Sequence, residues 1–134
     1  MTSQKLLLAR LARLASVALI CSMTSAFAAD RMPFNQKSFA DAQAAGKSIL
    51  VDVSAPWCPT CRAQKPIIEQ LSQLPEYKTL VIFDVDFDTQ EDALHSLKAQ
   101  QQSTLIAFKG DAETGRSVGS TQRGEISALF KKTQ

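Results

Sequence analysis

The chain has 134 residues, enough for one domain, and its composition of 45% hydrophobic and 21% charged residues is that of a globular protein. Three of the 15 basic residues and none of the 13 acidic ones lie within the first 28 positions, so the rest of the chain has 12 basic and 13 acidic residues, a net charge of −1. A chain this close to neutral lacks the basic excess that nucleic-acid binding uses, and we expect no nucleic-acid partner.

The N-terminal segment has the pattern of a secretory signal peptide. A positively charged start precedes a short apolar stretch at 14–20, and Ala26 and Ala28 form the A-x-A pattern of a cleavage site. A retained membrane anchor is the alternative, although the apolar stretch falls short of the roughly 20 residues that a spanning helix needs. We therefore predict a signal peptide at 1–28, a mature domain at 29–134, and export to the periplasm.

The first half of the mature domain predicts a helix, a strand and a second helix. Residues 35–45 suit a short helix with Asn35 as its N-cap and Gly46 after its end. The continuous apolar run at 48–53 is typical of a strand buried on both faces. Apolar residues at helical spacing then predict a helix that ends before Pro75.

The second half predicts two helices and three further strands. We expect a strand at 79–88, a helix capped by Thr89, strands at 103–110 and 115–119, and a last amphipathic helix around 125–130. The first two strands should be parallel and the last two an antiparallel hairpin. The expected fold is α/β, with a central mixed sheet of about four strands flanked by helices.

Removal of the signal peptide would also remove Cys21, which leaves Cys58 and Cys61 in "WCPTC". One pair cannot build a disulfide scaffold, but it can be a redox pair, a structural bridge or half of a metal site. The pair follows the strand at 48–53 and precedes the next helix. This is the end of the sheet at which open α/β proteins bind substrates.

The position of Cys58 at a helix start favours the redox alternative. The thiolate is the attacking species in disulfide exchange, and the unpaired N–H groups and partial positive charge of a helix N-terminus stabilise it. Pro59 suits the first turn, where a missing N–H is tolerated, and Arg62 adds positive charge. Cys61, one turn further on, can attack a mixed disulfide on Cys58. We expect Cys58 to be an exposed nucleophile and Cys61 a buried resolving thiol.

Asp52 is a carboxyl group inside an apolar strand. Burial disfavours its ionised form and should raise its pKa, which suits a proton acceptor and donor for Cys61. The alternative is an aspartate that caps a turn or faces solvent. Its place six residues before Cys58 favours the catalytic interpretation.

The segment "VDVSAPWCPTCRAQKP" resembles the active-site segment of the thioredoxin family. It has the buried aspartate, a tryptophan directly before C-x-x-C, and a proline, Pro66, five residues after the second cysteine; the likeness extends over 34–133. The resemblance implies a thioredoxin fold, disulfide exchange through Cys58 and Cys61, and no cofactor beyond that redox-active disulfide. It also implies substrate docking at the following residues: Trp57, Pro59, Thr60, Ser103 and Thr104.

Two positions depart from the family pattern. Ser103 stands where the family has a cis-proline, and because a cis bond at a non-proline costs about 3–4 kcal/mol we expect a trans peptide after Gln102. In the family this proline helps to keep metals off the thiols, so the resemblance implies that its replacement favours metal or cluster binding there. Asp84 stands where thioredoxins carry a lysine, and we expect its side chain to be rotated away or solvated. The alternative is an inward-facing Asp84, whose charge would repel that of Asp52 and raise the pKa of one carboxyl group further. Thr60 could donate a hydrogen bond to the Cys58 thiolate, which would make the protein more oxidising.

These features predict an enzyme, a monomeric, exported protein-disulfide oxidoreductase that reduces specific partner proteins. Its partners would be protein thiols and disulfides, with a membrane redox protein that recharges the pair. The alternative is a non-enzymatic module that holds a metal or cluster at the same cysteines. His95, the single histidine, is expected on a helix surface, and we assign no metal ligands. An inert disulfide fits poorly with Asp52 and Trp57 beside it.

Overall fold

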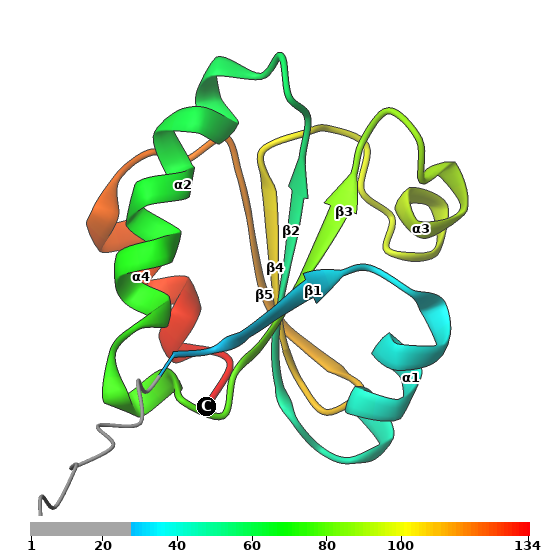
Figure 1. Cartoon of the computed structure of the whole chain (residues 1–134), viewed down its shortest axis with the longest axis vertical. Helices are drawn as coiled ribbons and strands as arrows, with labels where there is room; N and C mark the ends of the chain where they lie inside the picture. Colours follow the sequence, from blue (N-terminus) through cyan, green and yellow to red (C-terminus); the bar gives the residue numbers. More distant parts are fainter. Residues whose placement is uncertain (1–27) are drawn as a thin grey trace, which may run out of the picture.

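The computed structural model describes residues 28–134, in which five strands form one mixed sheet between two layers of helices (Figure 1). The predicted signal peptide lies outside the described residues, except for Ala28. The elements are β1 (Asp30–Pro33), α1 (Gln36–Ala44), β2 (Ser48–Ser54), α2 (Pro59–Ser72), a 3-10 turn (Pro75–Tyr77), β3 (Val81–Asp86), α3 (Glu91–Ser96), β4 (Thr104–Lys109), β5 (Ala112–Val118) and α4 (Arg123–Lys131).

The strand order is β1-β3-β2-β4-β5. β3 lies between β1 and β2 and is parallel to both, whereas β4 is antiparallel to β2 and to β5. The predicted parallel pair and antiparallel hairpin are thus confirmed. The expected number of strands was too low, because the four-residue edge strand β1 was missed; most of its residues are exposed and it carries no apolar run.

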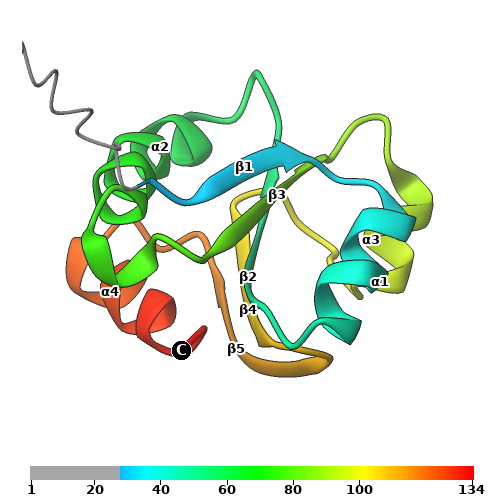
Figure 2. The ribbon, with the colours of Figure 1, turned by 60° about the horizontal axis from the view of Figure 1, so that its bottom comes forward.

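The sheet has a separate core on each face. On one face, strand side chains pack against α1 and α3, and on the other against α2 and α4; Figures 1 and 2 both show these helix pairs on opposite sides. Successive side chains of a strand point to opposite faces, so Val51 contributes to the first core and Leu50 to the second. By the same alternation, Asp52 belongs to the face covered by α2.

Local signals explain both ends of α1. Asn35 caps α1, since its Oδ1 accepts hydrogen bonds from the N–H groups of Lys37 and Ser38, and Gly46 follows with a φ of +66°. Thr89, however, is not the cap of α3. The Asp86 carboxylate instead accepts from the backbone N–H of Thr89, and this turn delays the helix to Glu91.

Two strands also have limits that differ from the prediction. β3 ends at Asp86, so the last two residues of the expected strand belong to the turn before α3. β5 begins at Ala112 and runs to Val118, because the hairpin turns tightly at Gly110, whose φ is +57°. The expected connection at 111–114 between the two strands of the hairpin is therefore largely strand.

Candidate active site

The end of β2 leads directly into α2 and places the two cysteines at the helix start. Cys58 is the N-cap of α2 and Pro59 occupies the first helical position, as expected. Cys58 and Cys61 form a disulfide, with their Cα atoms 5.3 Å apart, and the backbone N–H of Cys61 donates to Cys58 Sγ at 3.0 Å. A thiolate on Cys58 would lie at this same N–H group, which favours the charged form.

The expected exposure of Cys58 is wrong for this oxidised form. Cys58 is 1% exposed and Cys61 8%, because Ala55 and Phe87 pack against the pair and the Ser103 hydroxyl lies 3.7 Å from Cys58 Sγ. Phe87 and Ser103 are distant from Cys58 in the sequence, so a local sequence pattern could not predict that they bury it. The distinct roles of the two cysteines therefore rest on the position of Cys58 at the helix N-terminus, not on exposure.

Ser103 adjoins the disulfide through an unusual backbone conformation. The described residues contain no cis peptide bond, so the expected trans bond before Ser103 is confirmed, and the residue has a φ of +57°. Gln64 Nε2, from α2, donates to the Ser103 carbonyl at 3.3 Å. Thr104 is buried, and its hydroxyl donates to the Gln101 carbonyl. Of Ser103 and Thr104, it is thus Ser103 whose side chain lies next to Cys58 Sγ.

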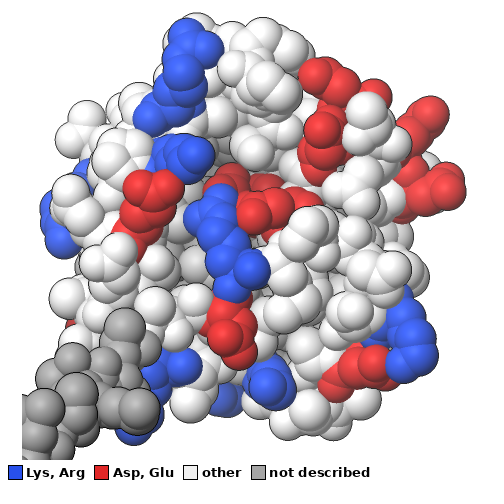
Figure 3. Space-filling view, in the orientation of Figure 1, with Lys and Arg blue, Asp and Glu red and all other residues white. Residues whose placement is uncertain are grey.

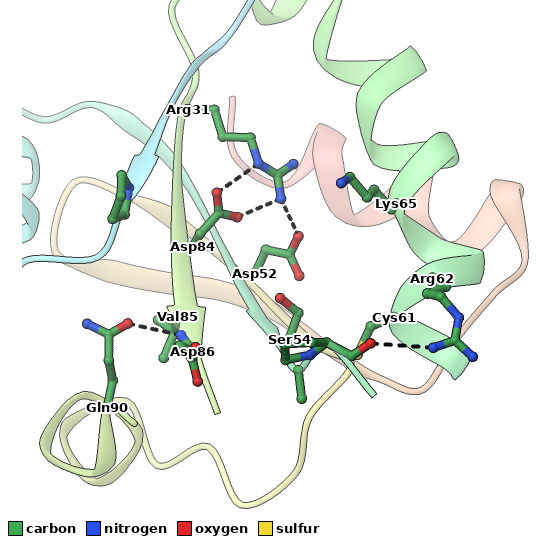
Figure 4. Close-up of a pocket in the computed structure, with 13 residues that line it drawn as sticks. Arg31, Asp52, Ser54, Cys61, Arg62, Lys65, Asp84, Val85, Asp86 and Gln90 are labelled. Carbon is green, nitrogen blue, oxygen red and sulfur yellow. Dashed lines mark hydrogen bonds and ion pairs between the residues drawn. The ribbon is translucent and has the colours of Figure 1, made fainter. Parts of the chain in front are cut away.

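Asp52 occupies the interior position that its sequence context predicts. It is 5% exposed, and burial raises the pKa of its carboxyl group, although the Arg31 guanidinium acts in the opposite direction. The predicted direction of the pKa is therefore confirmed. Asp52 and Cys61 line the same pocket of about 530 Å³, with Lys65 of α2 on its wall (Figure 4). The two side chains therefore border one common space.

Arg31 is a site residue that the sequence did not reveal. Its Nη2 lies 2.7 Å from Asp52 Oδ2 and 2.6 Å from Asp84 Oδ1, so one guanidinium binds both carboxylates (Figure 4). Asp84 is not rotated away, because β2 and β3 place it opposite Asp52 in register and Arg31 holds it there. Its side chain is nevertheless 36% exposed, so the expected contact with solvent is partly confirmed. The sequence does show one aspartate in each of two neighbouring strands, which could have indicated that Asp52 and Asp84 lie side by side. Arg31, the cation that binds them, belongs to β1, which the sequence analysis did not recognise as a strand.

The remaining predicted docking residues surround the disulfide at the surface. Trp57 is 55% exposed and its indole Nε1 donates to Asp88 Oδ2 at 2.9 Å, while Pro59 is exposed and Thr60 half-buried. Among the described residues, Thr60 donates no hydrogen bond to Cys58 in this oxidised form. The space-filling view shows acidic side chains over α3 and the end of β3, and basic ones over α2 (Figure 3).

His95 lies exposed in the last turn of α3, as expected for a surface residue. Within residues 28–134, no group of three or more histidine, cysteine, aspartate or glutamate side chains is arranged to hold a metal ion. In the same part of the chain, no helix is both long and apolar enough to cross a membrane.

A disulfide at the N-terminus of the helix that follows a central strand, with a buried carboxyl group beside it, defines a thiol–disulfide oxidoreductase. The thioredoxin family model matches residues 31–132, and this chain belongs to the thioredoxin family. It is a protein-disulfide oxidoreductase of the thioredoxin type, and proteins of this type act on protein thiols and disulfides.

Relatives of known sequence and structure agree with this assignment. Thioredoxin from Chlamydia trachomatis is 34% identical over 101 residues, which cover 75% of this chain and 95% of that protein. Trxlp from Edwardsiella tarda EIB202, known from a crystal structure, has 39% sequence identity and a TM-score of 0.74. The match covers 75% of this chain and 98% of the Trxlp chain. Thioredoxin NaTrxh from Nicotiana alata, at 22% identity and a TM-score of 0.68 over 80% of this chain and 95% of that one, shares the fold.

Proposed function

We propose that this protein is exported to the periplasm and reduces disulfides in specific partner proteins, and that a membrane redox partner returns it to the dithiol form. The observation that carries the chemistry is the shared pocket of Asp52 and Cys61 behind the helix-capping Cys58. The signal-peptide pattern at 1–28 supports export.

The size of the domain and its relatives support the reductive direction. The domain is small, and its relatives are thioredoxins. One of them, from Mycobacterium leprae, is named a bifunctional thioredoxin reductase/thioredoxin; it is 29% identical over 88 residues, 66% of this chain and 19% of that protein. These relatives support a cysteine pair that receives electrons and passes them to partner disulfides.

The proposed reaction begins with the reduced pair. The Cys58 thiolate attacks one sulfur of the partner disulfide, a mixed disulfide forms, and the other partner sulfur leaves as a thiolate. Cys61 then gives its proton to the Asp52 carboxylate, and its sulfur attacks Cys58 Sγ. The partner sulfur that was bonded to Cys58 departs as a thiolate. Two electrons have then passed from the cysteine pair to the partner. Asp52 afterwards releases its proton to the departing thiolate or to water.

Partner selection would take place on the surface around the disulfide. Trp57, Pro59 and Thr60 lie on one side of it, and Ser103 and Thr104 belong to the segment before β4. Because Thr104 is buried, its contribution to docking would come through the backbone, whereas the exposed ring of Trp57 can contact a partner directly. Among the described residues no third ligand joins the cysteines, and no observation favours the metal-binding alternative.

A trapping experiment tests the proposal. Cys61→Ser in the native compartment, quenched with acid, should accumulate partner proteins in dithiothreitol-sensitive adducts with Cys58, while the matched Cys58→Ser variant should capture none. The trapped chain should begin at Ala29, and cells without the protein should contain the same partners in oxidised form.

Three results would contradict parts of this proposal. Capture by Cys58→Ser instead of Cys61→Ser would reverse the roles of the cysteines. Adducts that retain residues 1–28 would refute cleavage and release. Partners that are reduced in cells lacking the protein would refute the reductive direction.

A further inference from the structure

Arg31 is the centre of a charged cluster on the α2 side of the sheet. Its Nη2 donates to both carboxylates, and its Nε donates to Asp84 Oδ2 at 2.9 Å. The guanidinium thus binds Asp84 through two nitrogens and Asp52 through one. Two-point binding of this kind fixes the plane of the guanidinium, and charged pairs of this geometry are among the stronger hydrogen bonds in proteins. Asp84 therefore orients Arg31, and Arg31 orients Asp52.

Strand register explains how three side chains from different strands meet. Asp52 pairs with Asp84 across β2 and β3, and Arg31 pairs with Ile82, two residues before Asp84 on β3. Residues two apart in a strand share a face, so Arg31 and both aspartates point to the side covered by α2. The side chain of Arg31 needs only to extend along β3 to reach both carboxylates.

Asp52 is subject to opposing influences from each element packed against it. Burial raises its pKa most; Arg31 from β1 lowers it by charge and by hydrogen bonding, Asp84 from β3 raises it, and Lys65 from α2 lowers it. Cys61, also from α2, lines the same pocket and loses its proton during resolution. Arg31 is therefore the main group that opposes the effect of burial on this carboxyl group.

We propose that Arg31 is a positioning residue of the disulfide exchange: held by Asp84, it binds and orients the Asp52 carboxylate in the pocket that Cys61 lines. The inference rests on the proposed role of Asp52. In the step concerned, the Cys61 S–H bond breaks, its proton goes to an Asp52 oxygen, and its electron pair stays on sulfur. That sulfur bonds to Cys58 Sγ, the bond between Cys58 Sγ and the partner sulfur breaks, and the partner sulfur leaves with the electron pair of that bond.

Two substitutions in the cluster should have opposite effects. Arg31→Gln removes the nearest cation, so the pKa of Asp52 should rise further and fewer molecules can accept the Cys61 proton at pH 7. Asp84→Asn keeps one side-chain oxygen that can accept a hydrogen bond from Arg31 but removes a like charge, so the pKa should fall. A general disturbance of the strand would move both variants in the same direction.

The first measurement is the titration of the Asp52 carboxyl carbon by NMR in the oxidised protein, where neither cysteine titrates. The signal is assigned by its absence in Asp52→Asn. Compared with the natural chain, Arg31→Gln should titrate at higher pH, Asp84→Asn at lower pH, and Arg31→Lys between Arg31→Gln and the natural chain. Lys37→Gln, which removes one cation from an exposed ion pair on α1, is the matched control and should leave the titration unchanged.

The second measurement is the reaction of the reduced protein with the disulfide of 5-thio-2-nitrobenzoate, which releases one coloured thiolate on attack by Cys58 and a second on resolution by Cys61. Proton acceptance by a positioned group is worth on the order of 10²–10⁴-fold in rate, so a partial loss in Arg31→Gln should slow the second phase about tenfold at pH 7. The difference should shrink at higher pH, and Arg31→Lys should restore most of the rate.

The outcomes separate this inference from the role of Asp52 on which it rests. If Asp52→Asn leaves the second phase unchanged, Asp52 is not the proton acceptor. If Asp52→Asn slows that phase but Arg31→Gln titrates like the natural chain, the inference about Arg31 is overturned. An Arg31→Gln effect that persists in the Asp52→Asn background would overturn it as well, because Arg31 would not then act through Asp52.

Discussion

Asp52 combines a chemical role with an energetic cost. It lies in a strand whose other side chains are largely buried, and burial raises the pKa of its carboxyl group even with Arg31 beside it. The folded chain therefore holds this proton more tightly than the unfolded chain does. Folding stability consequently falls as pH rises from the ordinary aspartate value of about 3.9 through the raised pKa, and it remains lower above that interval.

Asp52→Asn should therefore stabilise the oxidised protein at pH 7. We expect a gain on the order of 1 kcal/mol in the free energy of unfolding, because a neutral amide avoids the cost of burying a carboxylate. Arg31 is not left unpaired, since it keeps Asp84 as a partner. The gain should diminish as pH falls toward 4. Urea unfolding across this range measures it, with the exposed Asp41→Asn of α1 as control. A loss of stability at pH 7 would mean that the Arg31 ion pair outweighs the effect of burial.

Helix α2 carries both cysteines, and one buried side chain joins its middle to two loops. Gln64 Nε2 donates to the carbonyl of Ser103 and, at 2.8 Å, to the carbonyl of Ser120 before α4. Because the Ser103 hydroxyl meets Cys58 Sγ, this link helps to set the spacing between the helix and the segment opposite the disulfide. Gln64 thus connects the packing of α2 to the geometry of the site.

Gln64→Leu keeps the approximate size of the side chain but removes both hydrogen bonds. Buried carbonyls that lose their donor typically cost about 1–3 kcal/mol, and we expect a loss of stability in that range. Gln70→Leu on the same helix is the control, since Gln70 is exposed and bonds only to Arg123 among the described residues; its effect should stay within about 0.5 kcal/mol. Equal unfolding free energies of the two variants in urea would show that the link does not stabilise the fold.

At the scale of the whole molecule, the elements with strong local signals could be predicted from the sequence. The apolar run of β2, the helical spacing of α2 and the capping residue Asn35 each specify their structure within a few residues. Asp52 was predictable in the same way, as a charged residue inside an apolar run. The resemblance of the whole segment around the C-x-x-C pair to the thioredoxin active site then implied both the fold and the reaction.

Features that depend on distant segments could not be predicted in this way. β1 is short and mostly exposed, and it becomes a strand only by pairing with β3. Without β1 there was no reason to place Arg31 near Asp84, so Asp84 was expected to face solvent. The burial of Cys58 likewise depends on Phe87 and Ser103, which approach it from other parts of the chain.

The central claim is that the Cys58–Cys61 pair donates electrons to partner disulfides, and its reduction potential tests this most directly. Equilibration with redox buffers of known potential, followed by alkylation of the free thiols, measures it. The account predicts a value close to the roughly −270 mV of thioredoxin. A value near −120 mV, typical of a strong periplasmic oxidant, would contradict it and would indicate that stabilisation of the Cys58 thiolate makes this chain a donor of disulfides.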